Sequence, residues 1–131
     1  MRQLIQPALA QGKIVLCDRY ADSTMAYQGY GRGLDLAMLQ TLTHIATGGL
    51  KPAVTILLDI DVKRGLRRRQ SGGDEMNRLD LEGIAFHQRV RQGYHTLAAQ
   101  EPARWITVDG DRPAAAIQQE LREILMRVVG K

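Results

Sequence analysis

Two oppositely charged residues, Asp18 and Arg19, directly follow a short apolar run in this chain. The run, Ile14–Cys17, is continuously apolar, which is typical of a strand buried on both faces of a sheet. Open α/β sheets bind their ligands at the carboxyl ends of the strands, so both charged side chains are candidates for contacting a ligand. A structural alternative stays open, in which Asp18 pairs with Arg19 or caps the turn.

Hydroxyl and amide side chains come shortly after this charged pair. Ser23 could cap a short helix that runs to about Gln28. On that helix Thr24 and Gln28 are four residues apart and therefore share a face. This pair could hydrogen-bond the edge of a nucleobase, and Tyr27 adds a further hydroxyl group close by.

A basic cluster lies in the middle of the chain. Five of its members fall within seven residues and a sixth follows closely: Lys63, Arg64, Arg67, Arg68, Arg69 and Arg78. Guanidinium groups bind phosphate through planar, bidentate hydrogen bonds, although such clusters are also common on solvated helix faces. The net charge of +4 and the pI of about 9.6 are consistent with an anionic partner.

Alternating strands and helices must position these residues. Apolar runs predict three strands, at Ile14–Cys17, Val54–Leu58 and Trp105–Val108. Periodic segments predict a helix that ends before residue 12 and further helices over about 23–28, 34–46, 61–70, 79–99 and 113–129. The glycines at 29, 31 and 33 are expected to break regular structure, and 71–75 to form a mobile loop. This alternation predicts a parallel α/β sheet.

The composition bounds the class of protein. The 131 residues predict one domain, and 44% hydrophobic residues argue against disorder. A single cysteine, Cys17, excludes an internal disulfide framework. No apolar run approaches the roughly 20 residues of a membrane helix, and Met1–Gln11 lacks a signal-peptide core. We therefore expect a soluble, cytoplasmic protein with no membrane partner.

The segment Leu16–Gln28, LCDRYADSTMAYQ, resembles the signature of bacterial thymidylate kinases. Gly29–Asp35, Leu57–Asp59, the arginine-rich segment and Asn77–Asp80 are also similar to that family, so the likeness runs from end to end of the chain. It implies an α/β fold: a three-layer parallel sheet of the P-loop nucleoside monophosphate kinase type. It also implies transfer of the ATP γ-phosphoryl group to dTMP, giving dTDP, with Mg²⁺.

The resemblance also implies roles for the residues around the first strand. Arg19 would contact the phosphoryl groups of donor and acceptor, and Asp18 would approach Mg²⁺ through water. The thymidylate pocket would be lined by Ser23, Thr24, Tyr27 and Gln28.

A second set of implied roles concerns the ATP side. A lid at about residues 70–80 would close over the ATP phosphates, with Arg68, Arg69 and Arg78 as candidate ligands. Arg69 and Arg78 would act in catalysis, because phosphoryl transfer depends on positioning and charge stabilisation. The loop from Asp109 to Arg112 would lie beside the adenine.

One family element is missing from the sequence. No G-x-x-x-x-G-K-[ST] phosphate loop occurs, since Gly12-Lys13 lacks the earlier glycine. The chain therefore resembles the C-terminal part of the family, without its first strands. In the family the first strand lies between those expected here at Ile14–Cys17 and Val54–Leu58, which would leave a gap of roughly 9–10 Å. We expect this chain alone to lack dTMP-dependent ATP consumption.

Two alternative functions and one question of assembly remain open at this stage. A related deoxynucleoside or nucleotide kinase would share the Asp18-Arg19 pair. A non-catalytic basic module could instead bind nucleic acid. Because no aromatic residues alternate with the basic cluster, as a stacking platform requires, we expect no nucleic-acid partner. The family is usually homodimeric, and Met38, Leu42 and Ile45 could join such an interface or, for most of them, the core.

Overall fold

The computed structural model describes residues 3–70 and 81–130, and these form two strands and seven helices. In chain order the elements are α1 (Ile5–Ala10), α2 (Ala21–Thr24), the π-helix η1 (Met25–Gly31), α3 (Leu36–Thr47), β1 (Thr55–Asp59), α4 (Val62–Gln70), α5 (Leu81–Gln100), β2 (Trp105–Asp109) and α6 (Ala114–Val129).

The two strands pair in parallel. Their register runs from Thr55 opposite Trp105 to Asp59 opposite Asp109. The chain between them passes through α4 and α5, as parallel strands require a long crossover. The predicted parallel α/β class is confirmed, and an aspartate ends each strand at the same edge of the sheet.

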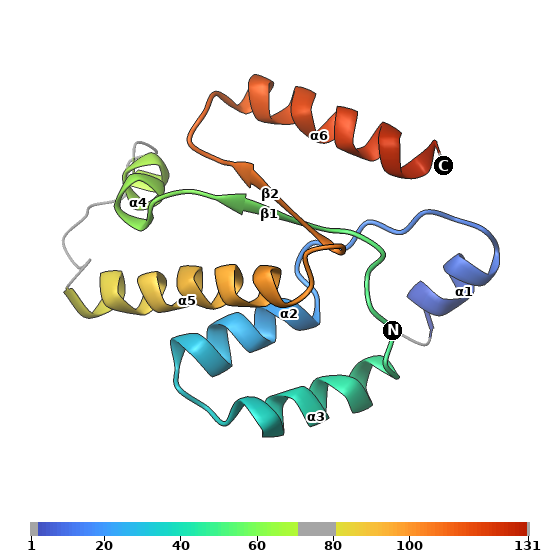
Figure 1. Cartoon of the computed structure of the whole chain (residues 1–131), viewed down its shortest axis with the longest axis horizontal. Coiled ribbons are helices and arrows are strands. Elements are labelled where there is room, and N and C mark those ends of the chain that lie inside the picture. Colours follow the sequence, from blue (N-terminus) through green and yellow to red (C-terminus); the bar gives the residue numbers. More distant parts are fainter. Residues whose placement is uncertain (1–2, 71–80, 131) are drawn as a thin grey trace.

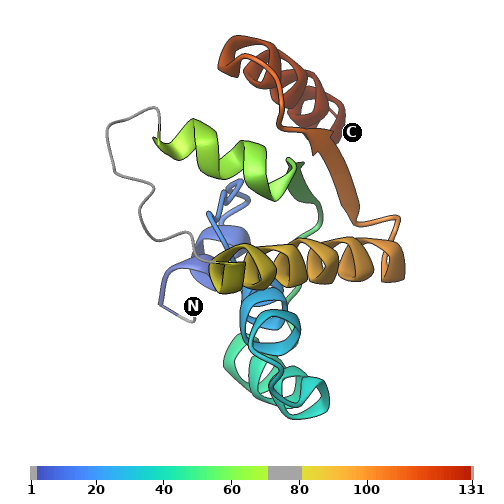
Figure 2. The same ribbon diagram turned by 90° about the vertical axis from the view of Figure 1, so that its left-hand side faces the viewer.

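The helices are arranged in layers around these strands (Figures 1 and 2). α6 lies on one side of the sheet and α5 on the other, with η1 packed against α5 and α3 outermost. Buried apolar side chains occur in most of these elements: Ala26, Leu39, Val62, Val90, Trp105, Val108 and Ile124. Among the described residues, no helix has the combined length and hydrophobicity of a bilayer span.

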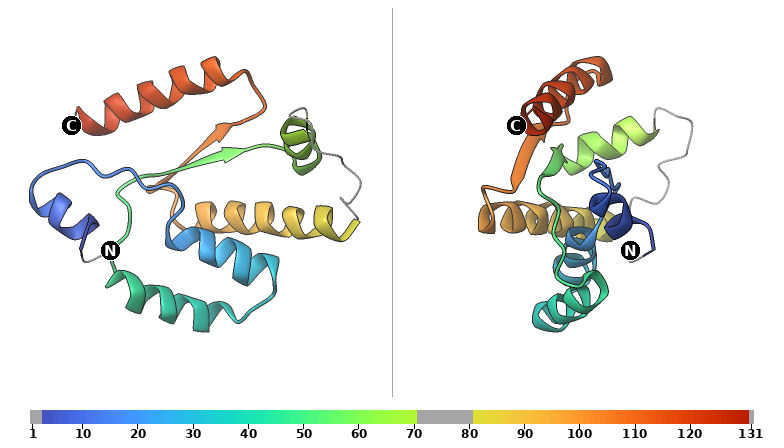
Figure 3. Two further views of the ribbon diagram at one scale, coloured as in Figure 1. Left: turned by 180° about the vertical axis from the view of Figure 1, so that it is seen from behind. Right: turned by 90° about the vertical axis from the view of Figure 1, so that its right-hand side faces the viewer.

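The predicted first strand is wrong. Ile14–Cys17 forms no ladder hydrogen bonds, and it passes the sheet as an irregular segment (Figure 3). Ile14 is 66% exposed and Leu16 77% exposed, although the apolar run predicted burial on both faces. The physical reason is the lack of a neighbour, because in the described part of the chain no strand lies between this segment and β1.

The prediction that the glycines at 29, 31 and 33 break regular structure is wrong for the first two, because η1 continues as a π-helix to Gly31. It holds for Gly33, which lies beyond the end of η1 with φ of 77°. The glycines at 29 and 31 permit close packing instead. A Cβ atom on Gly31 would lie 2.7 Å from Cε2 of Phe86 and 2.9 Å from Cγ2 of Val90, both on α5. Ser23 is not the cap of α2 either, because the N-cap position is Tyr20.

The outer helix α3 begins and ends as expected. Asp35 caps its first turn by accepting a hydrogen bond of 2.9 Å from the Ala37 N–H, and Gly48 ends it with φ of 63°. Its apolar face is only partly buried: Leu39 is in the core, whereas Leu42 is 54% and Ile45 71% exposed. Core packing was expected for most of this face, and that expectation is wrong for the described chain.

Candidate active site

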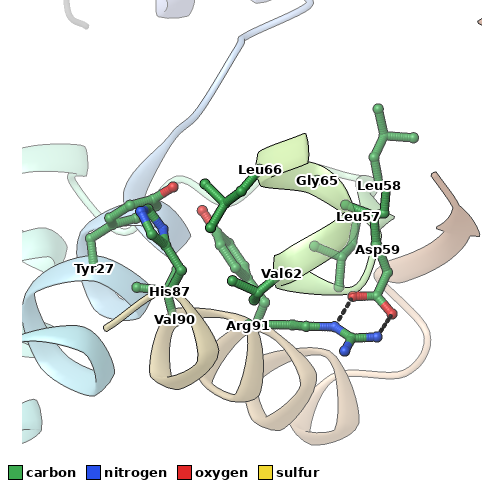
Figure 4. Close-up of a pocket in the computed structure, with 12 residues that line it drawn as sticks. Tyr27, Leu57, Leu58, Asp59, Val62, Gly65, Leu66, His87, Val90 and Arg91 are labelled. Carbon is green, nitrogen blue, oxygen red and sulfur yellow. Dashed lines mark hydrogen bonds and ion pairs between the residues drawn. The ribbon is translucent and has the colours of Figure 1, made fainter. Parts of the chain in front are cut away.

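A cleft of about 280 Å³ lies beside the carboxyl end of β1, between η1, α4 and α5 (Figure 4). Its lining comes from all four elements and from the turn after β1: Tyr27, Leu57, Leu58, Asp59, Ile60, Val62, Gly65, Leu66, His87, Val90, Arg91 and Tyr94. The sequence predicted ligand binding at the carboxyl edge of the sheet, and this is where the cleft opens.

Tyr27 joins the predicted substrate residues to this cleft. The Arg19 guanidinium lies over the Tyr27 ring, 5.3 Å from its centroid. The same ring packs against Phe86 and edge-on against Tyr94, with centroids 6.1 and 6.3 Å away. A cation therefore lies beside a ring that lines the cleft, and Leu66 of the arginine-rich helix α4 lines the same cleft.

Arg19 itself has an unusual backbone. Its φ of 62° lies in the left-handed region, where it is the only non-glycine residue among those described. Such a conformation costs a side-chain-bearing residue roughly 1–2 kcal/mol. Strain of this kind concentrates at functional positions, and the exposed guanidinium of this residue is the one that lies over the Tyr27 ring.

The four predicted pocket residues lie on one continuous helical stretch, α2 and η1. The Ser23 hydroxyl is 2.9 Å from the Tyr94 hydroxyl, and burial raises the pKa of Tyr94. Thr24 is exposed and Gln28 is half-buried. The structure therefore brings Tyr27 to the cleft and engages Ser23 with α5.

An ion pair at the end of β1 was not predicted. Nε and Nη2 of Arg91 donate to the two carboxylate oxygens of Asp59 at 2.9 and 3.1 Å, as Figure 4 shows. Nε2 of His95 is buried and lies 3.0 Å from Oδ1 of Asp59, without the alignment of a hydrogen bond. The hydrogen bonds from Arg91 hold the pKa of Asp59 below its ordinary value.

Asp18 is exposed and has no ion-pair or hydrogen-bond partner in the described part of the chain. A free carboxylate suits Mg²⁺, which keeps several waters and takes its other ligands from one or two carboxylates and from phosphates. Within residues 3–70 and 81–130, no three His, Cys, Asp or Glu side chains gather closely enough to hold a metal by themselves.

The basic helix α4 contacts the loop that follows β2. Nη1 and Nη2 of Arg68 donate to the carbonyl oxygens of Gly110 and Arg112 at 2.6 and 3.1 Å. Arg64 forms an ion pair with Asp111 in the same loop. In this arrangement Arg68, expected over the ATP phosphates, holds the loop that was expected beside adenine.

The remaining predicted residues are placed as follows. Asp109 ends β2, is exposed, and accepts a hydrogen bond of 2.9 Å from the Asp111 N–H. Arg69 lies in α4, but its side chain is outside the described residues. Arg78, the loop predicted at 71–75 and residues 71–80 of the predicted lid are also outside them.

Sequence reasoning missed Arg91 and Tyr94 as members of this region. Arg91 contacts Asp59 across 32 residues and Tyr94 contacts Ser23 across 71 residues. Neither position belongs to a local motif that the sequence presents. The only weak signal was the spacing of Arg91, Tyr94 and His95, which puts them on one face of a long helix.

Comparison with known proteins gives a consistent result. A family model described as "Thymidylate kinase" matches residues 1–121. The thymidylate kinase of Nostoc punctiforme is 52% identical over 125 residues, covering 95% of this chain and 59% of that protein. The thymidylate kinase of Thermomicrobium roseum is 51% identical over 127 residues, covering 94% and 60%. The chain thus spans about three-fifths of the length of the curated relatives it matches.

Proposed function

The chain belongs to the thymidylate kinase family, and we propose that it forms the acceptor side of a site that transfers the γ-phosphoryl group of ATP to dTMP, giving dTDP. The observation that carries the proposal is the contact between the Arg19 guanidinium and the Tyr27 ring at the edge of the cleft. That contact puts a cation and an aromatic face of the family signature in one place. The deoxynucleoside kinase and nucleic-acid alternatives are not favoured by the relatives.

In this proposal Arg19 contacts the phosphoryl groups of donor and acceptor. Its guanidinium is exposed, and a fixed cation stabilises the charge that accumulates on the transferred group. The thymidylate pocket is formed by Ser23, Thr24, Tyr27 and Gln28. Asp18 orients water ligands of Mg²⁺, and the ion, when bound, neutralises charge on the phosphates.

Fewer of the proposed ATP-binding residues than of the proposed dTMP-binding residues lie in the described part of the chain. We assign phosphate contacts to Arg68, Arg69 and Arg78, and base contacts to the loop at Asp109. The proposal for Arg68 requires its guanidinium to leave the carbonyl oxygens of Gly110 and Arg112, because both terminal nitrogens donate to them. Closure of the lid at about 70–80 would accompany this exchange.

We propose further that a segment outside these 131 residues supplies the phosphate loop. The sequence contains no such motif. A groove of about 650 Å³, lined mainly by apolar residues of 12–17, 50–54, α1 and α6, lies where an additional strand would cover Ile14 and Leu16. Among the described residues β1 pairs with β2 alone, and the groove reaches the residues directly before β1, so a strand that continued from the groove could pair with its other edge.

The decisive experiment compares two proteins in a coupled assay of ADP formation. One is this chain alone, for which we expect no dTMP-dependent turnover. The other is a chimera in which the N-terminal part of the Nostoc punctiforme relative precedes Met1, for which we expect turnover. Arg19→Ala in the chimera should abolish turnover. Arg32→Ala should retain it, because the exposed Arg32 lies over the Phe86 ring and not over Tyr27.

Two results would contradict this proposal. Robust turnover by the chain alone would exclude the need for an added phosphate loop. A folded chimera that is protected against heat more strongly by dCMP or dGMP than by dTMP would overturn the choice of substrate. A coupled assay and a thermal-shift series on the same preparation therefore separate the reaction from its specificity.

Two further parts of the proposal concern assembly and location. We propose a homodimer that buries the exposed face of α3, which includes Met38, Leu42 and Ile45. We also propose a cytoplasmic location, supported by the free and exposed thiol of Cys17, which suits a reducing compartment.

A further inference from the structure

Arg104, in the turn between α5 and β2, forms a bidentate ion pair with Asp22 of α2. Nη1 and Nη2 of the guanidinium lie 2.8 and 3.0 Å from Oδ2 and Oδ1 of the carboxylate. The two side chains are only 12% and 19% exposed. Parallel hydrogen bonds of this kind fix relative orientation as well as distance.

The same guanidinium also contacts the sheet and the end of α5. Nη1 donates to Oγ1 of Thr55, the first residue of β1, at 2.7 Å. Nε donates to Oε2 of Glu101 at 3.1 Å, and the cation lies 5.2 Å from the centroid of the Trp105 ring. One side chain therefore connects α2 with the starts of both strands.

α2 has a single turn, and its N-cap residue Tyr20 makes no side-chain cap hydrogen bond. Two other side-chain contacts hold it: the Tyr20 hydroxyl donates to the Leu50 carbonyl oxygen at 3.1 Å, and the Ser23 hydroxyl lies 2.9 Å from that of Tyr94 on α5. The Asp22–Arg104 pair adds a direct connection to β1, through Thr55. The segment before it, residues 13–19, belongs to no strand and is mostly exposed. The register that a paired strand would impose on α2 is therefore not available from that side.

We propose that Arg104 is a positioning residue that acts through Asp22 to fix α2 and η1 against the sheet. Arg104 touches no predicted substrate residue. Asp22 directly precedes Ser23, so the ion pair sets where the pocket residues Ser23 and Tyr27 stand relative to the end of β1. The consequence for thymidylate binding rests on the proposed function, whereas the consequence for α2 does not.

The test uses this chain with Arg104→Gln, Arg104→Lys and Asp22→Asn. Lys51→Gln is the matched control, because Lys51 pairs with Glu101 of the same network but not with α2. Hydrogen exchange is followed by mass spectrometry at residues 21–31 and, as an internal reference, at α6. A titration with dTMP is carried out on the same proteins.

Arg104→Gln and Asp22→Asn should speed exchange at 21–31 by at least about tenfold and change exchange in α6 by less than about twofold. The exchange rate at 21–31 in Arg104→Lys should lie between those of these two variants and that of the wild type, because one ammonium group cannot bridge both carboxylate oxygens and Thr55. Lys51→Gln should match wild type. If dTMP binds, its affinity should fall in the order of the exchange changes.

Unchanged exchange at 21–31 in both Arg104→Gln and Asp22→Asn would overturn the inference. A uniform increase that includes α6 would also overturn it, because that pattern indicates a general loss of stability. Should Arg104→Gln fail to fold, Arg104→Lys and Asp22→Asn decide the matter alone. Wild-type protein that does not bind dTMP would count against the proposed function and would leave the exchange result standing.

Discussion

The hydroxyl oxygens of Ser23 and Tyr94 lie 2.9 Å apart and connect α2 to α5. The Tyr94 ring also packs against Trp105 at the start of β2, with centroids 6.4 Å apart. Ser23, a residue of the predicted thymidylate pocket, therefore contacts α5, the long helix that lines the cleft. The position of Ser23 depends on α5 as much as on its own short helix.

Tyr94→Phe retains the ring and removes this hydrogen bond. We expect it to lower the free energy of unfolding by about 1 kcal/mol, the usual net contribution of such a bond. Ser23→Ala should have a similar effect, and the double variant should lose little more than either single one. Urea denaturation of all four proteins measures the coupling, and strictly additive losses would show that the two hydroxyls act independently.

Asp59 should make stability depend on pH in the acid range. Arg91 holds its pKa below the ordinary value of 3.8 in the folded chain. Its stabilising contribution is therefore fully present above about pH 3.8 and is lost as the pH falls through the lower, folded-state value. Asp59→Asn should flatten this part of a curve of unfolding free energy against pH.

The matched control for that curve is Asp61→Asn. The nearest Arg91 nitrogen is 3.9 Å from Asp61, whose side chain is 54% exposed, so solvent screens the interaction. Asp61→Asn should keep the acid-range slope of the wild type. Equal slopes for wild type and Asp59→Asn would contradict the role assigned to the Asp59–Arg91 pair.

Gly31→Ala should force η1 away from α5. The new methyl carbon would lie 2.7 Å from the Phe86 ring and 2.9 Å from Val90. Overpacking of this kind costs about 1–3 kcal/mol, and we expect a loss in that range by thermal or urea unfolding. Adding Phe86→Leu should recover part of the loss, and a fully stable Gly31→Ala protein would show that the helices can separate freely.

Leu42→Glu tests the proposed homodimer. Leu42 is 54% exposed in the middle of α3, and a carboxylate buried in an apolar interface without a partner is strongly unfavourable. We expect sedimentation to show a dimer for the wild type and a monomer for Leu42→Glu. Gln40→Glu, which adds the same charge at another exposed position of α3, should remain dimeric. A monomeric wild type would contradict the proposed homodimer through α3.

The sequence predicted those elements that carry their own local signals. The helix at 34–46 is observed as Leu36–Thr47 because Asp35 caps its start and Gly48 adopts the left-handed conformation at its end. The strands at Val54–Leu58 and Trp105–Val108 are observed within one residue of the prediction. Apolar runs and helix caps act over a few residues, so they can be recognised without knowledge of the fold.

The Ile14–Cys17 strand failed for a different reason. Its apolar run is as clear as that of β1, yet a strand exists only where a neighbouring strand pairs with it, and the described residues offer none. The role of the glycines at 29 and 31 was mispredicted for the same reason, because they allow close contact with α3 and α5. Both errors concern partners that are distant in sequence.

The sequence by itself determined the family, and it named the candidate site residues: the Asp18-Arg19 pair and the hydroxyl and aromatic residues after it. Only the tertiary structure decided which of them meet. It brought Arg19 over Tyr27, paired Ser23 with Tyr94, and engaged Arg68 with Gly110 and Arg112. A motif records residue types along the chain, whereas hydrogen bonds and ring contacts depend on distances that folding alone establishes.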